Sequence, residues 1–302
     1  MATAKEWVQG ARPRTLPAAL APVLVGTAVA AYEQHAIAGR AVLALVVSLA
    51  LQVGVNYAND YSDGIRGTDE VRVGPVRLVG QRLAAPRAVR AAALAAFAVA
   101  ALAGLALVAL TQAWWLLAVG AGAVVAAWTY TGGPRPYGYA GLGELFVFVF
   151  FGVVAVVGTT YVQTGALSAL AVTLSIGVGL LTVAILVANN LRDIPGDTAH
   201  GKRTMAVRLG DARTRWWYQL CLLGGYLTAL VVGLLGLTGG DAWPAGALLA
   251  LASAPLLIPL VRTVRSGATG RALVPVLAGT GRLLLAYSLT LSAGLLLCAY
   301  RR

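Results

Sequence analysis

Residues 41–63 read AVLALVVSLALQVGVNYANDYSD, an uncharged apolar run that ends in a cluster of amide and carboxyl side chains. The run over 41–58 approaches the length of about 20 residues that an α-helix needs to cross a bilayer. Lipid offers no hydrogen-bond partners to the backbone, so a segment of this kind is expected to be helical. The stretch therefore predicts a membrane-spanning helix that carries polar residues to the membrane surface.

The same apolar character extends over the whole chain of 302 residues. Apolar residues make up 59% of it and charged residues 11%, whereas a water-soluble domain is roughly 45–50% apolar and about 25% charged. An ordinary soluble protein is excluded. We therefore expect an all-α, polytopic integral membrane protein with nine transmembrane helices, in one domain over 1–302, with spans near 15–33, 41–58, 91–111, 113–130, 143–163, 167–190, 216–237, 243–261 and 283–300.

The first apolar run, 15–33, has a second interpretation. Three basic residues precede it, as basic residues precede the apolar core of a cleaved secretory signal. Pro17 and Pro22 interrupt this run. The prolines favour a span that is retained in the protein.

Basic residues lie almost entirely on one side of the predicted spans. With the N-terminus in the cytoplasm, all but three of the 23 Lys and Arg residues fall in cytoplasmic segments, and the exceptions are Arg40, Arg301 and Arg302. This bias predicts a multi-pass protein of the cell membrane with its charged loops on the cytoplasmic side. The net charge of +12 is thus explained by topology and by contact with membrane lipid, and no nucleic acid is expected as a partner.

Carboxyl groups are few and concentrated on that same side. Four of the eleven acidic residues lie in 59–70, NDYSDGIRGTDE, and two more lie in 189–197, NNLRDIPGD. Residues four apart share one helix face, so a continuing helix would stack Asn59 on Asp63. Asn56 with Asp60, and Asn189 with Asp193, have the same spacing.

Two oxygen-rich patches beside a bilayer would repel each other unless a cation lay between them. Mg²⁺ fits, because it takes hard oxygen ligands and completes its shell with water and phosphate. Pro195 is expected to end the second helix near Asp193, which leaves Asp197 on a turn and makes Asp193 the firmer ligand. The alternative is that these residues only cap helix ends. Their repetition in an acid-poor chain favours a metal and phosphate site.

Basic residues flank both patches. Arg66 follows the first patch, and Lys202 and Arg203 follow the second. Carboxylate-bound metal with nearby Arg and Lys suits the ionisation of a diphosphate, because negative charge develops on the leaving group.

Together these motifs resemble those of the UbiA superfamily of intramembrane aromatic prenyltransferases. Its Asn-x-x-x-Asp signature is matched by Asn59 and Asp63, and its Asp-x-x-x-Asp motif by Asp193 and Asp197. Position 67 is Gly, where benzoate-type members commonly carry Asp. The Asp two residues later, Asp69, gives a spacing that is similar to that of the naphthoate branch. Further matching segments are ARPRTLP at 11–17, GLGEL at 141–145, GKRT at 201–204 and VRLG at 207–210.

The resemblance implies a helix bundle around a central cavity, in which Mg²⁺ bridges the Asp motifs and a polyprenyl diphosphate while the prenyl chain occupies an apolar tunnel. It further implies transfer of that chain to 1,4-dihydroxy-2-naphthoate, with loss of CO₂ and diphosphate, to give demethylmenaquinone. The nearer alternative is another acceptor, such as hydroxybenzoate, homogentisate, haem or a lipid. The more distant one is an anion transporter, which predicts ionisable residues near mid-bilayer or paired broken helices.

The resemblance also assigns roles to individual residues. The expected catalytic and metal residues are Asn59, Asp63, Asp193 and Asp197, with Asp60 and Asp69 as further catalytic members. The expected substrate-binding residues are Asn56, Arg66, Asn189, Asn190, Lys202, Arg203, Tyr130 and Arg135, the last two for the aromatic acid. Tyr130 is alternatively an interface anchor, and Glu144 is either a helix-terminal charge or a cavity residue.

Overall fold

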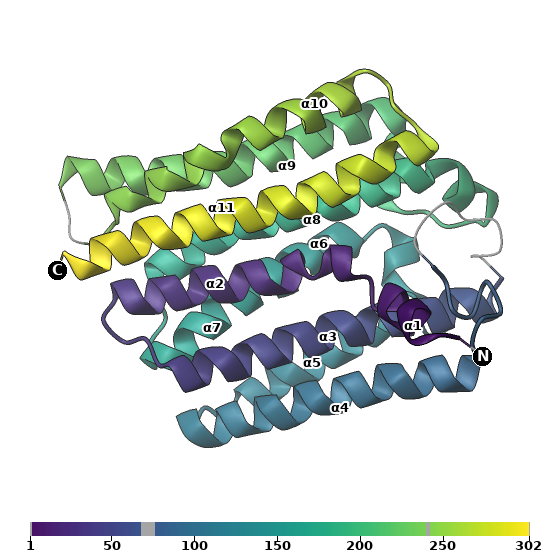
Figure 1. Ribbon diagram of the computed structural model, residues 1–302, viewed down its shortest axis with the longest axis horizontal. Helices are drawn as coiled ribbons and strands as arrows, with labels where there is room; N and C mark the ends of the chain where they lie inside the picture. Colours follow the sequence, from purple (N-terminus) through teal and green to yellow (C-terminus); the bar gives the residue numbers. More distant parts are fainter. Residues whose placement is uncertain (1, 68–75, 240–241, 302) are drawn as a thin grey trace.

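The computed structural model describes residues 2–67, 76–239 and 242–301, and most of the described residues are helical. The long helices lie side by side in a bundle (Figure 1). In chain order the elements are α1 (Ala4–Gly10), η1 (Pro13–Thr15), α2 (Pro17–Tyr32), α3 (Ala38–Ile65), α4 (Pro86–Thr111), α5 (Leu116–Thr129), η2 (Tyr137–Ala140), α6 (Gly143–Val147), η3 (Phe148–Val154), α7 (Ala155–Thr164), α8 (Ala169–Ala199), α9 (Met205–Thr238), η4 (Ala245–Leu256), α10 (Leu257–Arg265), η5 (Gly270–Leu273) and α11 (Val274–Tyr300).

The expected multi-pass helical architecture is confirmed. Among the described residues, seven helical segments are long and apolar enough to cross a membrane. The pair Ala4–Thr15 and Pro17–Tyr32, bent by 50°, makes an eighth if it counts as one span, and α5 is a shorter apolar helix of 14 residues. Each of the nine predicted runs thus coincides with helix, although the first and fourth contain helices shorter than a full span.

Small residues allow the helices to approach closely. A Cβ atom on Gly54 of α3 would lie 2.5 Å from the ring of Phe97 on α4. A Cβ atom on Gly294 of α11 would overlap the carbonyl oxygen of Gly246 on η4. Helices in lipid associate largely through such van der Waals contact, so these glycines set the spacing of the two helix pairs.

Helix α8 forms the centre of the bundle and packs against α9, α11 and η3. Buried tyrosines beside it satisfy their hydroxyl groups across helices, as polar groups in hydrocarbon must. Tyr218 pairs with Thr280 at 2.7 Å, and Tyr287 donates to the carbonyl oxygen of Gly225 at 3.0 Å. These bonds join α9 to α11.

The predicted end of this helix near Asp193 is wrong. Helix α8 continues to Ala199 with Pro195 inside it, so Asp197 stands on a helix and not on a turn. A proline in a helix removes one backbone donor and produces strain, but φ near −65° is itself helical. Thr198 donates its hydroxyl to the carbonyl oxygen of Ile194 at 2.7 Å in this last part of the helix.

The span formed by α6, η3 and α7 contains a π-helical segment at Phe148–Val154. Gly152 lies here against α8, where a Cβ atom would come within 2.7 Å of the Cα of Gly179. Such segments are rare and often occur at functional sites. Here the consecutive residues Phe150 and Phe151 both line the cavity described below.

Candidate functional site

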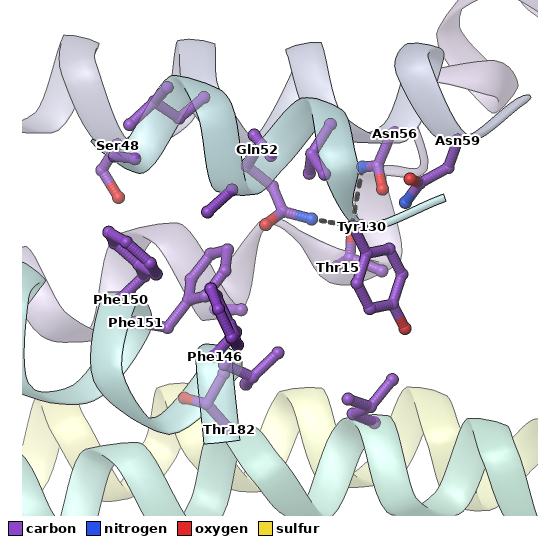
Figure 2. A pocket seen from close by; sticks show the side chains of 18 of the residues that line it. Thr15, Ser48, Gln52, Asn56, Asn59, Tyr130, Phe146, Phe150, Phe151 and Thr182 are labelled. Carbon is purple, nitrogen blue, oxygen red and sulfur yellow. Dashed lines mark hydrogen bonds between the residues drawn. The ribbon is translucent and has the colours of Figure 1, made fainter. Parts of the chain in front are cut away.

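A cavity of about 1730 Å³ lies among α2, α3, α4, α5, α7 and α8. One part is lined by apolar residues of α4, α5 and α7, and another by polar residues near the ends of α3 and α8. Ser48, Gln52, Asn56 and Asn59 follow one another along α3, with Phe146, Phe151 and Thr182 across the space from them (Figure 2). The cavity therefore suits an amphiphile with a polar head and a long apolar tail.

Amide side chains of α3 anchor the segment that precedes α2. Asn56 Nδ2 donates to the carbonyl oxygen of Ala11 at 2.9 Å. Asn56 Nδ2 and Gln52 Nε2 both donate to Thr15 Oγ1, at 3.1 Å and 2.8 Å (Figure 2). Arg12 in this segment has a left-handed backbone, with φ of 54°, and lines the cavity. Asn56 thus helps to organise the wall of the cavity that carries Arg12.

Asp63 is the centre of a buried cluster at the polar end. Tyr139 Oη donates to Asp63 Oδ1 at 2.5 Å, and Lys202 Nζ lies 3.3 Å from that oxygen. Lys202 Nζ also stands 4.4 Å from the centroid of the Tyr139 ring. One turn earlier, Asn59 Oδ1 accepts a hydrogen bond from Thr131 at 2.8 Å. The helix face predicted to carry Asn59 and Asp63 is formed, and it meets Lys202 as part of one site.

The second motif on α8 also reaches the cavity. Asp197, Asn189 and Asn190 line it, as does Arg192. Asp193 forms an ion pair with Arg192, with Nε to Oδ1 at 2.7 Å and Nη2 to Oδ2 at 2.8 Å. Arg192 Nη2 further donates to Asn189 Oδ1 at 2.8 Å. Asp197 is therefore the second-motif carboxyl group that lines the cavity, whereas Asp193 orients a guanidinium beside it.

Aromatic rings line the cavity between its polar and apolar parts. Tyr130 and Tyr137 meet edge to face with centroids 5.5 Å apart, and Tyr137 stacks on Phe146 at 4.0 Å. Burial raises the pKa of Tyr137, so its hydroxyl stays protonated at neutral pH. These flat apolar surfaces favour contact with another ring.

Several predicted site residues have other surroundings. Asp60 is fully buried and accepts the backbone N–H groups of Leu78 at 2.7 Å and Val79 at 3.0 Å. Arg66 donates to the carbonyl oxygens of Thr131 and Gly133.

Arg135 and Arg203 have exposed side chains, and neither is among the described residues that line the cavity. The backbone N–H of Arg203 donates to the carbonyl oxygen of Tyr139 at 2.9 Å. Asp69 lies outside the described residues.

The contributors that sequence reasoning missed include Gln52, Thr15, Tyr139 and Arg192. Gln52 has a sequence signal, since it is a lone amide within an apolar run and lies one turn before Asn56 on the same face. Tyr139 has no such signal, because only tertiary contact brings its hydroxyl group to α3. Thr15 lies in the matching segment 11–17, but its contacts with α3 are likewise tertiary.

The donor set around the cavity fits Mg²⁺. Asn59, Asp63 and Asp197 offer hard oxygen atoms, and Mg²⁺ commonly takes only one or two carboxylates together with phosphate and water. Within the described ranges, no three His, Cys, Asp or Glu side chains gather into a metal cage. The site thus suits a metal that shares its coordination with a bound phosphate.

Comparison with known proteins agrees with this geometry. The model of the UbiA prenyltransferase family matches residues 19–273. The 1,4-dihydroxy-2-naphthoate octaprenyltransferase of Mycobacterium tuberculosis (strain ATCC 25618 / H37Rv) is 53% identical, with 98% of each chain covered. The protein of the same name from Escherichia coli (strain K12) is 36% identical, covering 91% of this chain and 89% of that one.

A solved structure has the same fold. It is a UbiA homolog from Archaeoglobus fulgidus bound to GPP and Mg²⁺, with a TM-score of 0.64 and 15% identity over 95% of this chain and 99% of that one. The family match covers most of the helical bundle and both polar motifs. On this evidence the chain belongs to the UbiA prenyltransferase family.

Proposed function

We propose that this protein transfers a polyprenyl chain from a polyprenyl diphosphate to 1,4-dihydroxy-2-naphthoate, releasing diphosphate and CO₂ and giving demethylmenaquinol, the hydroquinone form of demethylmenaquinone. The observation that carries the proposal is one cavity that joins Asn59, Asp63, Asp197 and Lys202 to a long apolar arm. The names of the two relatives support the choice of acceptor. We further propose that the whole chain acts as one domain in the cell membrane, with the polar end of the cavity on the cytoplasmic side.

The residues that would hold Mg²⁺ are Asn59, Asp63 and Asp197. Asp193, which the resemblance also assigns to the metal, orients Arg192 beside them. Bound there with the diphosphate, the metal would neutralise charge on the leaving group. Lys202 adds a fixed positive charge next to Asp63, and Arg12, Arg14 and Arg77 line the same cavity. These groups favour the state in which the bond between the allylic carbon and oxygen has broken and its electron pair has left with the diphosphate.

The second half of the reaction takes place beside two apolar surfaces of the cavity. We call these the apolar arm, lined by α4, α5 and α7, and the aromatic wall, formed by Tyr130, Tyr137 and Phe146. They exclude water, which would otherwise capture the allylic cation. The acceptor ring then supplies the electron pair for the new carbon–carbon bond, and loss of CO₂ from the substituted carbon restores the aromatic system. This sequence requires no covalent bond to the protein.

The test uses the full-length protein, purified in detergent and placed in lipid nanodiscs. Octaprenyl diphosphate and Mg²⁺ are incubated with 1,4-dihydroxy-2-naphthoate, 4-hydroxybenzoate or homogentisate, and products are identified by mass spectrometry. We expect demethylmenaquinol, recovered as demethylmenaquinone after oxidation in air, from the naphthoate alone. The product should be lost with EDTA and return with added Mg²⁺. Prenylation of another acid in its place would overturn the proposed acceptor.

A further inference from the structure

Glu144 is a buried carboxyl group at the start of a membrane-spanning segment, and the proposed reaction does not yet use it. It is 3% exposed, and its Oε1 accepts a hydrogen bond from Asn190 Nδ2 at 3.0 Å. Its Oε2 is buried with no hydrogen-bond partner among the described residues, and none of their basic side chains pairs with it. A buried carboxyl group of this kind is costly, so its contact with Asn190 calls for a functional explanation.

This contact fixes the orientation of the Asn190 amide. Asn190 lines the cavity, while Glu144 lies behind it on α6. The amide presents its NH₂ group to Glu144, because Asn190 Nδ2 is the donor and Glu144 Oε1 the acceptor. The Asn190 amide oxygen is then available to accept, and no donor from the described part of the chain occupies it.

The surroundings of Asn190 include the aromatic wall. The residue before Glu144 is Gly143, where a Cβ atom would lie 3.2 Å from the Tyr130 ring and 3.3 Å from Leu186. Tyr130 and Leu186 line the cavity together with Asn190, and Leu186 precedes Asn190 by one turn of α8. The amide oxygen of Asn190 is thus a hydrogen-bond acceptor close to flat apolar surfaces that suit a ring.

We infer that Glu144 is a positioning residue, which holds the Asn190 amide so that its oxygen accepts a hydrogen bond from a phenolic hydroxyl of the aromatic acceptor. The two substrates differ in whether they can donate a hydrogen bond to this oxygen. An ionised prenyl diphosphate has acceptor oxygens and no hydroxyl donor, and a carbonyl oxygen in front of a carboxyl group does not favour an anion. A dihydroxylated ring carries the matching donor. The inference rests on the proposed function and adds to it the group that orients the ring.

The test compares the isosteric variant Glu144→Gln with Glu144→Leu. Gln keeps an oxygen that accepts from Asn190, whereas Leu removes it. We expect Glu144→Leu to raise KM for 1,4-dihydroxy-2-naphthoate roughly 10-fold or more, with KM for octaprenyl diphosphate within about 2-fold of the wild type. Glu144→Gln should raise that KM less than Glu144→Leu does, because Gln keeps an oxygen that accepts from Asn190, although its own NH₂ group can also donate to the amide.

A second measurement probes the hydroxyl contact directly. 1-Hydroxy-2-naphthoate and 4-hydroxy-2-naphthoate each lack one hydroxyl and serve as competitive inhibitors against the dihydroxy acid. In the wild type, one of them should bind about 5-fold or more weaker than the other, because it lacks the hydroxyl that Asn190 accepts. In Asn190→Leu this difference should disappear. If Glu144→Leu does not accumulate, the two KM values are compared in Asn190→Leu, which removes the same hydrogen bond from the other side.

Three results would overturn the inference: equal changes in both KM values, the same effect of Gln and Leu at position 144, or analogue discrimination that survives in Asn190→Leu. Failure of the wild-type protein to prenylate the naphthoate at all is a different result. That result would overturn the proposed function itself. Prenylation that proceeds equally well in the Glu144 variants would overturn only the role of Glu144.

Discussion

Lys202 Nζ lies 3.3 Å from Asp63 Oδ1, although the two residues are 139 positions apart in the chain. Both side chains are almost fully buried, at 7% and 3% exposure. A buried charge is tolerated only with a partner, so the pair ties the end of α3 to the segment after α8. The contact brings the two polar motifs into one site.

Asp63→Ala and Asp193→Ala should each abolish turnover. Each removes a carboxylate, of which Asp63 faces the cavity and Asp193 orients Arg192. We expect a loss in kcat on the order of 100-fold or more, measured as diphosphate release in nanodiscs and normalised to the folded protein recovered. Asp211→Asn is the control and should keep wild-type turnover, because Asp211 pairs with Arg215 on α9 and neither residue lines the cavity. Wild-type rates in either alanine variant would contradict the assigned roles.

Lys202→Met should lower kcat/KM for the prenyl diphosphate by roughly 10- to 100-fold. The variant removes a positive charge from the cavity and leaves Asp63 without this partner. Lys202→Arg retains the charge but not the compact ammonium, so an intermediate rate is expected. Arg213→Met, at an exposed site on α9, controls for a general loss of positive charge, and an equal loss in that variant would rule out a local role for Lys202.

Asp60→Ala should reduce stability. Both oxygens of Asp60 accept buried backbone N–H groups, from Leu78 and Val79, and leaving these donors unpaired costs about 1–3 kcal/mol. Thermal unfolding in detergent should show a lower Tm than for the wild type, with a smaller decrease for Asp60→Asn, which keeps one acceptor oxygen. An unchanged Tm in Asp60→Ala would show that the bonds to Leu78 and Val79 do not contribute to stability.

Gly294→Ala should loosen the contact between α11 and η4. The added Cβ would overlap the Gly246 carbonyl oxygen, and relief of such overpacking costs roughly 1–3 kcal/mol. Gly39→Ala is the matched control, because a Cβ there meets nothing within 4 Å. It should be neutral or slightly stabilising, since Ala favours a helix over Gly. Equal Tm values for the two variants would argue against close packing at Gly294.

Gly158→Leu should shorten the prenyl chain that the protein prefers. Gly158 lines the cavity on α7, and nothing lies within 4 Å of a Cβ built there, so the new side chain would fill space in the apolar arm. Competition between geranyl and octaprenyl diphosphate should shift toward the shorter substrate by about 10-fold. Gly39→Leu, outside the cavity, is the control and should leave the ratio of geranyl to octaprenyl product unchanged. An unchanged ratio in Gly158→Leu would show that the prenyl chain does not lie beside Gly158.

The sequence alone determined the helical membrane architecture and the two polar motifs. Hydrophobic run length is a local property, because each span must satisfy its own backbone in lipid. The stacking of Asn59 on Asp63 was predictable for the same reason, since helical spacing places residues four apart on one face. Gln52 was also accessible to this reasoning, as an amide within an apolar run.

Tertiary structure alone decided which partners these residues meet. Asp60 and Asp63 lie in the same helix three residues apart, yet Asp60 holds the backbone at Leu78 and Asp63 meets Tyr139 and Lys202. Likewise, Pro195 was compatible with a helix end or with continuation to Ala199. Hydrogen bonds between distant segments depend on how whole helices pack, and the spacing of residues along the sequence does not determine that packing.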